Sequence, residues 1–135
     1  MKNVVIDTNV VISSVLSAKG NPAAIMSLVS DRVIQVYYND EILDEYIRVL
    51  AYERLKIAPD KQAEVIEKIK EVGISINPQV SAVLLLDESD RIFYDTAQAI
   101  GAILITGNIK HYPSEPFIMT PADYWQELIE INEND

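Results

Sequence analysis

The sequence contains no cysteine and a single histidine, His111, which narrows the metal sites and catalytic groups open to it. Without cysteine there is no disulfide framework, no thiolate zinc site and no thiol nucleophile. One histidine excludes a multi-histidine metal centre. No 18 consecutive residues are apolar, so no membrane-spanning helix is predicted, and Asp7 interrupts any signal-peptide apolar region. These absences predict a soluble cytoplasmic protein.

Basic residues are scarce: 11 lysines and arginines stand against 21 aspartates and glutamates, giving a net charge of −10. This balance argues against a protein that grips nucleic acid through a broad basic surface. A nuclease is not excluded by this charge, because a cluster of carboxylates can bind phosphate through cations. The length of 135 residues and the 49% apolar content fit a single domain over residues 1–135.

Apolar runs alternate with helical patterns along the chain. Buried parallel strands are predicted at residues 4–6, 34–38, 102–106 and 116–120, with a further short strand at either 74–76 or 83–86. Helices are predicted at residues 10–17, 22–30, 40–55, 59–72, 88–100 and 121–131. Asn21 and Asp87 are expected to cap two of them. The alternation predicts an α/β fold with right-handed crossovers and a parallel sheet covered on both faces.

Polar residues gather at one edge of this predicted sheet. Asp7, Thr8 and Asn9 follow the first strand, and Thr106 to Asn108 follow the strand near residue 104. Asp90 begins the helix that feeds the latter strand, so it lies at the same carboxyl edge. Ligands of open parallel sheets bind at this edge. The topology therefore brings Asp7, Asp90 and Asn108 together.

Each acid also has an ordinary structural interpretation. Asp7 could cap the first helix, and Asp90 could simply favour the positive end of its helix dipole. Glu45 lies about 60° around its helix from Ile42, at the edge of the apolar stripe. Glu41 stands one turn earlier, and the two like charges repel unless a cation relieves them.

Four segments, in order, resemble the PIN-domain family, in particular the toxins of bacterial and archaeal toxin–antitoxin pairs. The resemblance runs from about Lys2 to Tyr124. It rests on Val4-Val5-Ile6-Asp7-Thr8-Asn9-Val10, Asp40-Glu41-Ile42-Leu43-Asp44-Glu45-Tyr46, Asp87-Glu88-Ser89-Asp90-Arg91-Ile92-Phe93-Tyr94-Asp95-Thr96-Ala97 and Leu104-Ile105-Thr106-Gly107-Asn108. Many members place a fourth Asp where this chain has Asn108. One branch has an Asn-x-Lys-His-aromatic-Pro pattern, which is similar to residues 108–113.

The resemblance implies a three-layer α/β/α sandwich and a ribonuclease that uses Mg²⁺ or Mn²⁺. It implies that Asp7, Glu45 and Asp90 are catalytic, with Asp7, Asp90 and Asn108 as metal ligands. A carboxylate-held cation can activate water without histidine. Four residues are expected to support the acids: Thr8, Asn9, Thr106 and Asp95. Three are expected to contact the phosphate backbone of the substrate: Arg91, Lys110 and His111. For Asp95 the alternative is a plain surface acid, and for the three basic residues it is a solvated side chain.

Other functions compete with this one. The missing fourth acid suggests, as runner-up, a PIN-like domain with weak or no catalysis that binds RNA or protein. A phospho-acceptor receiver domain would need a pair of acids before Asp7, and this sequence has none there. A phosphatase with a nucleophilic Asp would need a second Asp at the position of Asn9. The expected partners are an RNA substrate, a cognate antitoxin and a second copy in a homodimer. Tyr37, Tyr38, Tyr46 and Tyr94 are expected mostly in the core, and any that face outward would suit self-association or an antitoxin groove.

Overall fold

A computed structural model describes residues 2–134 of the chain, with side chains for residues 2–131. Five strands form one parallel sheet in the order β3-β2-β1-β4-β5. The strands are β1 (Asn3–Ile6), β2 (Gln35–Tyr38), β3 (Ile74–Ser75), β4 (Ile103–Ile105) and β5 (Ile118–Met119). The helices are α1 (Thr8–Leu16), α2 (Asn21–Ser30), α3 (Asp40–Leu50), α4 (Pro59–Val72), α5 (Arg91–Ile100) and α6 (Pro121–Asn134). Three single-turn helices complete the list: η1 (Glu53–Leu55), η2 (Glu88–Asp90) and η3 (Ile109–His111).

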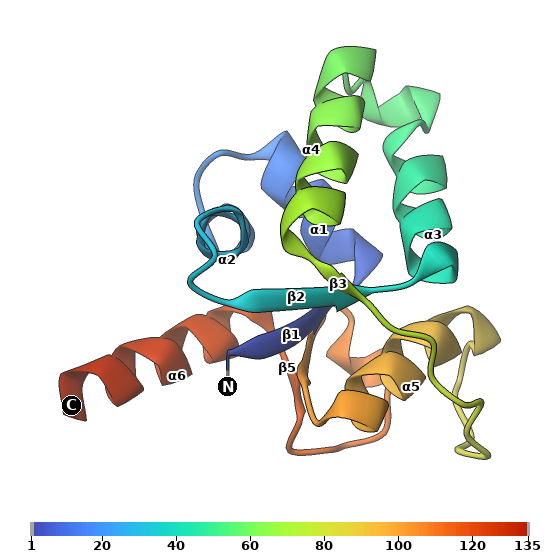
Figure 1. Ribbon diagram of the computed structural model, residues 1–135, viewed down its shortest axis with the longest axis vertical. Coiled ribbons are helices and arrows are strands. Elements are labelled where there is room, and N and C mark those ends of the chain that lie inside the picture. Colours follow the sequence, from blue (N-terminus) through green and yellow to red (C-terminus); the bar gives the residue numbers. More distant parts are fainter. Residues whose placement is uncertain (1, 135) are drawn as a thin grey trace.

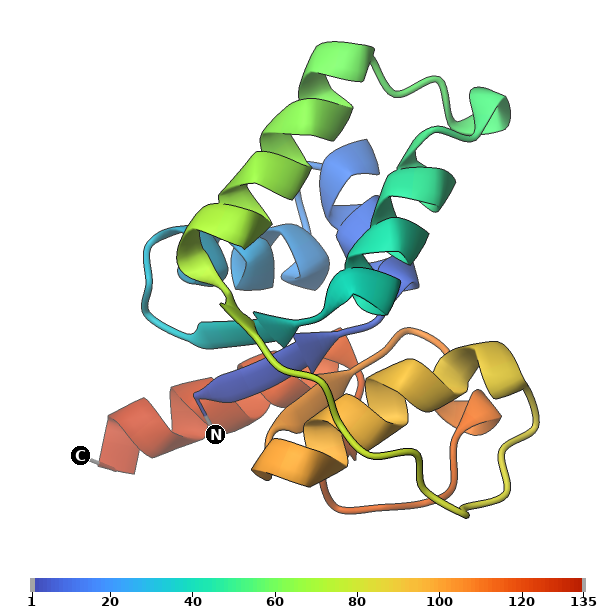
Figure 2. The ribbon, with the colours of Figure 1, turned by 45° about the vertical axis from the view of Figure 1, so that its right-hand side comes forward.

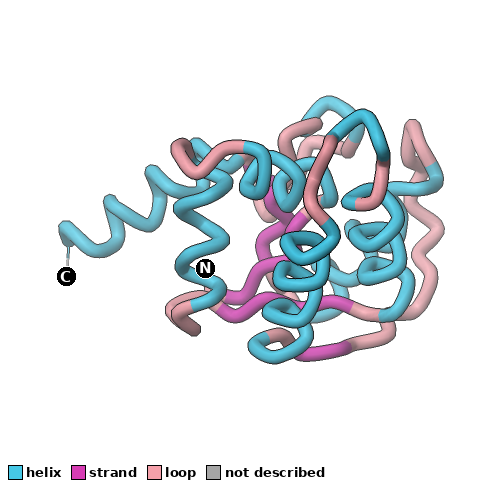
Figure 3. Tube along the Cα trace, turned by 90° about the horizontal axis from the view of Figure 1, so that it is seen from above, coloured by secondary structure: helices cyan, strands magenta, loops and turns pink. Residues whose placement is uncertain are grey.

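The sheet separates two groups of helices. Helices α1 to α4 pack together above it, and α5 covers the opposite face (Figures 1 and 2). Helix α6 packs beside α2 and then extends away from the sheet (Figure 3). The predicted three-layer α/β/α sandwich is therefore confirmed. None of the helices within residues 2–134 is long and apolar enough to cross a membrane.

The central strand is buried on both faces, as parallel strands between two helical layers must be. Val4, Val5 and Ile6 of β1 are at most 1% exposed. Helix α3 shows how a surface helix is fixed beside such a strand: Asn39 Oδ1 accepts the Ile42 N–H at 3.0 Å as an N-cap, and Ile42, Tyr46 and Leu50 form a buried stripe.

The sequence located the strands within one or two residues and was wrong at several helix ends. Each of the four predicted runs overlaps a strand, and the fifth strand is Ile74–Ser75, while residues 83–86 form no strand. The helix predicted over 40–55 ends at Leu50 and is followed by η1. Gly20, not Asn21, is the N-cap of α2, because Asn21 already belongs to the helix. The tyrosines are in the core as expected: Tyr46 and Tyr94 are buried, and Tyr37 and Tyr38 are half-buried against it.

Gly73 joins α4 to the edge strand through a close approach. A Cβ at this position would lie 2.6 Å from the Ile69 carbonyl and 2.8 Å from the ring of Tyr38. Only glycine leaves this space, so β3 can begin directly after α4 and pair with β2. The chain then crosses to the other face, and β4 lies on the far side of β1. The carboxyl ends of β1 and β4 thus flank the point where the strand order reverses, where such sheets bind ligands.

Candidate active site

Asp7 lies directly after β1 in the region between the carboxyl ends of β1 and β4, called the crevice below, and it is hydrogen-bonded to β4. Its backbone N–H donates to the carbonyl of Ile105 in β4 at 2.9 Å. Its Oδ1 accepts the Thr8 N–H at 2.8 Å, so Asp7 also caps α1, as one of its two interpretations predicted. Its Oδ2 accepts two hydroxyls, from Thr106 at 2.8 Å and from Tyr112 at 3.0 Å. The carboxylate is only 5% exposed and has a single fixed position.

Burial raises the pKa of Asp7, and the hydrogen bonds from Thr106, Tyr112 and Thr8 partly offset this effect. Tyr112 was not among the residues singled out in the sequence. The aromatic position in the 108–113 pattern indicated only a ring, whereas the hydroxyl makes the contact. Tyr46 was also missed as a contributor: its hydroxyl donates to the carbonyl of Ile6, the residue before Asp7.

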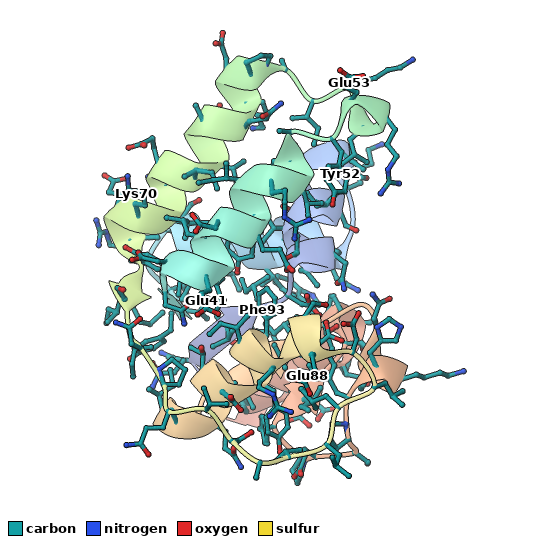
Figure 4. All side chains as sticks on the ribbon, turned by 90° about the vertical axis from the view of Figure 1, so that its right-hand side faces the viewer. Glu41, Tyr52, Glu53, Lys70, Glu88 and Phe93 are labelled. Carbon is teal, nitrogen blue, oxygen red and sulfur yellow. The ribbon has the colours of Figure 1, made fainter. Side chains whose placement is uncertain are left out.

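Glu45 reaches the same crevice from α3. The Thr8 hydroxyl donates to Glu45 Oε2, which links the acid on α3 to the residue next to Asp7. Its other oxygen, Oε1, lies 3.6 Å from the largely exposed guanidinium of Arg48. Tyr46 on α3 packs against Phe93 on α5, with ring centroids 6.3 Å apart, and Figure 4 shows Phe93 between these two helices. This packing fixes α3, and with it Glu45, relative to the helix that begins at Asp90.

Asp90 contributes the third carboxylate. Its Oδ2 is buried and has no hydrogen-bond partner, and His111 Nδ1 at 3.7 Å is too distant to supply one. Burial, followed by the nearby charges of Asp7 and Asp87, raises the pKa of Asp90 to about 6. The charge of Glu45 acts in the same direction. The structure therefore brings Asp7 and Glu45 close enough for their charges to act on Asp90. The topology predicted this convergence for Asp7 and Asp90, and the resemblance implied it for Glu45.

The loop after β4 is hydrogen-bonded to residues beside Asp7. The Gly107 N–H donates to Asn9 Oδ1 at 2.8 Å, and the Asn108 N–H donates to the Thr106 hydroxyl at 3.0 Å. Thr106 thus connects Asn108 to Asp7. The Asn108 residue is exposed, and its amide makes no side-chain hydrogen bond within the described residues. Its assignment as a metal ligand stays a prediction.

Two of the predicted residues lie elsewhere. Asp95 is buried on the face of α5 that meets residues 76–87, where its Oδ2 accepts the Ser81 N–H at 3.0 Å. Arg91 is directed to the same segment, with hydrogen bonds to Ser81, Val83 and Glu88. The structure does not bring these two side chains to the three acids. Lys110 is exposed beside His111, at the open edge of the crevice.

The donors suit a hard cation. The three acids offer carboxylate oxygens, and the unpartnered Asp90 Oδ2 is a buried acceptor that a cation would satisfy. Among the described side chains, no three acidic or histidine groups stand close enough to enclose an ion. Mg²⁺ commonly takes one or two carboxylates and keeps several waters, so Asp7 and Asp90 with water are sufficient.

Comparison with known proteins agrees with this geometry. The PIN domain family model matches residues 3–110, a range that contains all three acids and Asn108 but ends two residues before Tyr112. An uncharacterized protein of Methanocaldococcus jannaschii is 32% identical over 108 residues, which cover 78% of this chain and 70% of the archaeal protein. PIN domains are generally nucleases and generally use divalent metal ions. With the α/β/α sandwich and Asp7 directly after β1, these matches show that the chain belongs to the PIN domain family.

Proposed function

We propose that this protein is a divalent-metal-dependent ribonuclease, with Asp7 and Asp90 as metal ligands and Glu45 as the third catalytic acid. The observation that carries the proposal is the buried Oδ2 of Asp90, which lacks a hydrogen bond beside the fixed carboxylate of Asp7. Leaving a buried carboxylate oxygen unpaired costs folding free energy. A cation in the crevice would remove this cost.

The bound cation, Mg²⁺ or Mn²⁺, would supply an activated water and stabilise negative charge on the scissile phosphate. The protein groups have separate parts. Thr106 and Tyr112 hold Asp7 Oδ2 in place, and the Thr8 N–H donates to Oδ1. Glu45 is positioned through Thr8 to orient and deprotonate the attacking water. Lys110 and His111, at the rim, are placed to meet the RNA backbone.

The test is RNA cleavage by the purified protein with Mn²⁺, Mg²⁺ or chelator, combined with thermal melts under the same conditions. We expect cleavage only with metal. We also expect Mn²⁺ to raise the melting temperature, because an ion that binds only the folded state and relieves repulsion stabilises it. Cleavage that persists in chelator, or a melting temperature insensitive to millimolar metal, would contradict the mechanism.

A second candidate function, RNA or protein binding without strong catalysis, is supported by Asn108. Where many relatives place a fourth acid, this chain has an uncharged, exposed amide. A PIN-like domain that binds RNA or protein with weak or no catalysis would fit this loss of charge. The two functions separate in the assay above: the second predicts RNA binding without metal-dependent product.

A role as the toxin of a toxin–antitoxin pair, acting as a homodimer and inhibited by a cognate antitoxin, is a further proposal. Its support is the likeness of residues 108–113 to one branch of such toxins. The four tyrosines considered for self-association are buried or half-buried, so a dimer would need another surface. Sedimentation at tens of micromolar is expected to give twice the chain mass of 15.2 kDa. A strict monomer would contradict the dimer.

A further inference from the structure

A second hollow lies outside the candidate active site, between the beginning of α3, helix α5 and the extended segment of residues 76–87. Its volume is about 490 Å³. Four carboxylates line it, and none belongs to the group around Asp7: they are Asp40, Glu41, Glu88 and Asp95. Figure 4 shows Glu41 and Glu88 on the same face of the molecule, beside the junction of α3 and α5. The apolar part of the wall comes from Pro78, Val80 and Ile92.

Asp95 is the unusual member of this group. It is 4% exposed, and while its Oδ2 accepts the Ser81 N–H, its Oδ1 is buried without any hydrogen-bond partner. Among the described side chains, only Asp90 Oδ2 and Asp95 Oδ1 are buried polar atoms in this condition. The first marks the candidate active site. The second marks the hollow, where a donor from outside would satisfy it.

Arg91 does not serve Asp95, although it lines the same hollow. Its Nε and Nη2 donate to Glu88 at 2.7 and 2.8 Å, and Nη2 also donates to the Val83 carbonyl at 2.6 Å. Nη1 donates to the carbonyl and hydroxyl of Ser81 at 2.9 and 3.0 Å. These contacts use the five N–H groups of a guanidinium. Arg91 therefore neutralises Glu88 and anchors the segment, and it leaves Asp95 unpaired.

The remaining charge balance favours a cation. Asp40, Glu41 and Asp95 have no salt bridge within the described residues, while the N-terminus of α3 offsets only part of their charge. The described carboxylates are nowhere gathered in threes closely enough to enclose a metal ion. A hollow of this size, with acids at its rim and apolar walls, instead matches a cationic head on an aliphatic stem.

We propose that this hollow binds an arginine or lysine side chain of a basic partner protein, with Asp95 Oδ1 accepting from the cationic head. The adjoining surface suits a polypeptide rather than a free polyamine: Val80, Leu84 and Leu86 are 82%, 91% and 83% exposed along the extended segment. A second copy of this chain is a poor occupant, because each copy carries a net charge of −10. The proposal is independent of nuclease activity.

The probe is the peptide acetyl-Val-Arg-Leu-amide, added to the ¹⁵N-labelled full chain while the Ser81 amide resonance is followed. This amide reports on Asp95 directly through its 3.0 Å hydrogen bond. We expect a saturable shift up to about 10 mM peptide, a range typical of one anchored side chain. The same peptide with citrulline, which keeps the shape of arginine and lacks its charge, should leave the resonance in place.

Asp95→Asn keeps an oxygen for Ser81 and removes the charge, and it should weaken peptide binding by about tenfold. Glu127→Gln, an equal charge change on the exposed side of α6, should bind like the wild type. If Asp95→Asn does not fold, the exposed pair Asp40→Asn and Glu41→Gln takes its place, with weaker binding again expected. No saturable shift, an equal response to citrulline, or unchanged affinity in these variants would overturn the proposal.

Discussion

Asp7→Asn is expected to reduce metal-dependent RNA cleavage by at least about 100-fold, because the amide keeps the shape of the carboxylate but cannot hold or charge-balance the cation. The fold should survive. The remaining side-chain oxygen can still accept the Thr8 N–H, and the hydroxyl of Tyr112 can rotate to accept from the new amide. Single-turnover cleavage of a labelled RNA with Mn²⁺ measures the loss.

Tyr112→Phe is a milder substitution at the same site. It retains the charge of Asp7 and the Thr106 hydrogen bond and removes only the contact at 3.0 Å. We expect about a tenfold loss of rate, because one of two groups that fix Oδ2 is gone. The loss should be smaller at high Mn²⁺, because a higher ion concentration fills a site whose loosened carboxylate binds the ion more weakly. Wild-type rates in Asp7→Asn would show that chemistry does not occur at this carboxylate.

The convergence of Asp7 and Asp90 followed from topology, which is why it was accessible from the sequence. A residue directly after a parallel strand lies at the carboxyl edge, and the helix feeding the next strand begins there. Asp7 meets the first condition and Asp90 the second. Glu45 lies at the edge of an apolar helical stripe, but its assignment to the same site came from the resemblance to the PIN-domain family. The argument for Asp7 and Asp90 uses chain order alone, so it did not depend on the packing of individual side chains.

The contacts of Asp95 and Arg91 could not be predicted, because they depend on a segment with no periodic pattern. Asp95 was expected either to support the site or to be a plain surface acid, although its position five residues after Asp90 places it about 140° around the helix from that acid. The sequence did not reveal what it faces instead. Residues 76–87 form no helix, and beyond Ile74–Ser75 no strand, and only their path across α5 brings Ser81 to both Asp95 and Arg91.

The edge strand shows the same limit. The runs at 74–76 and 83–86 are both apolar and short, and either fits a strand. The close approach of Gly73 to Tyr38 decides between them, because it sets the first run directly beside β2. That contact joins residues far apart in the chain. The exposure of Leu84 and Leu86 is the consequence for the second run.

Asp90→Asn is expected to make the metal-free protein more stable at neutral pH and, at the same time, inactive. The folded-state pKa of Asp90 is raised from 3.8 to about 6, so the folded protein binds this proton more tightly than the unfolded chain does. The protonated Asp90 carboxyl therefore favours the folded state over the unfolded state. This contribution to the free energy of unfolding is lost as the pH rises from about 4 to 6, and above that range the charged carboxylate destabilises the fold.

The amide carries no such penalty. Allowing for the part of the Asp90 side chain that water still reaches, we expect Asp90→Asn to gain about 1–2 kcal/mol in chelator at about pH 7.5. The gain should vanish near pH 4, where Asp90 is protonated in the wild type as well. Urea unfolding of both proteins at the two pH values gives the difference, and comparing variants at each pH cancels the titration of the other acids.

Asp87→Asn is the matched control. Asp87 lies three residues before Asp90, and its pKa is shifted in the opposite direction. The Ser89 N–H donates to Asp87 at 2.9 Å and lowers its pKa, so this exposed charge favours the folded state at neutral pH. Its replacement should destabilise the protein slightly, with the effect fading as the pH falls through the lowered pKa. Metal separates the two variants further: Mn²⁺ should still stabilise Asp87→Asn, whereas Asp90→Asn should lose the shift together with cleavage. An Asp90→Asn protein that is less stable than the wild type in chelator, or that keeps the full response to Mn²⁺, would mean that Asp90 is a structural residue rather than a ligand held in readiness.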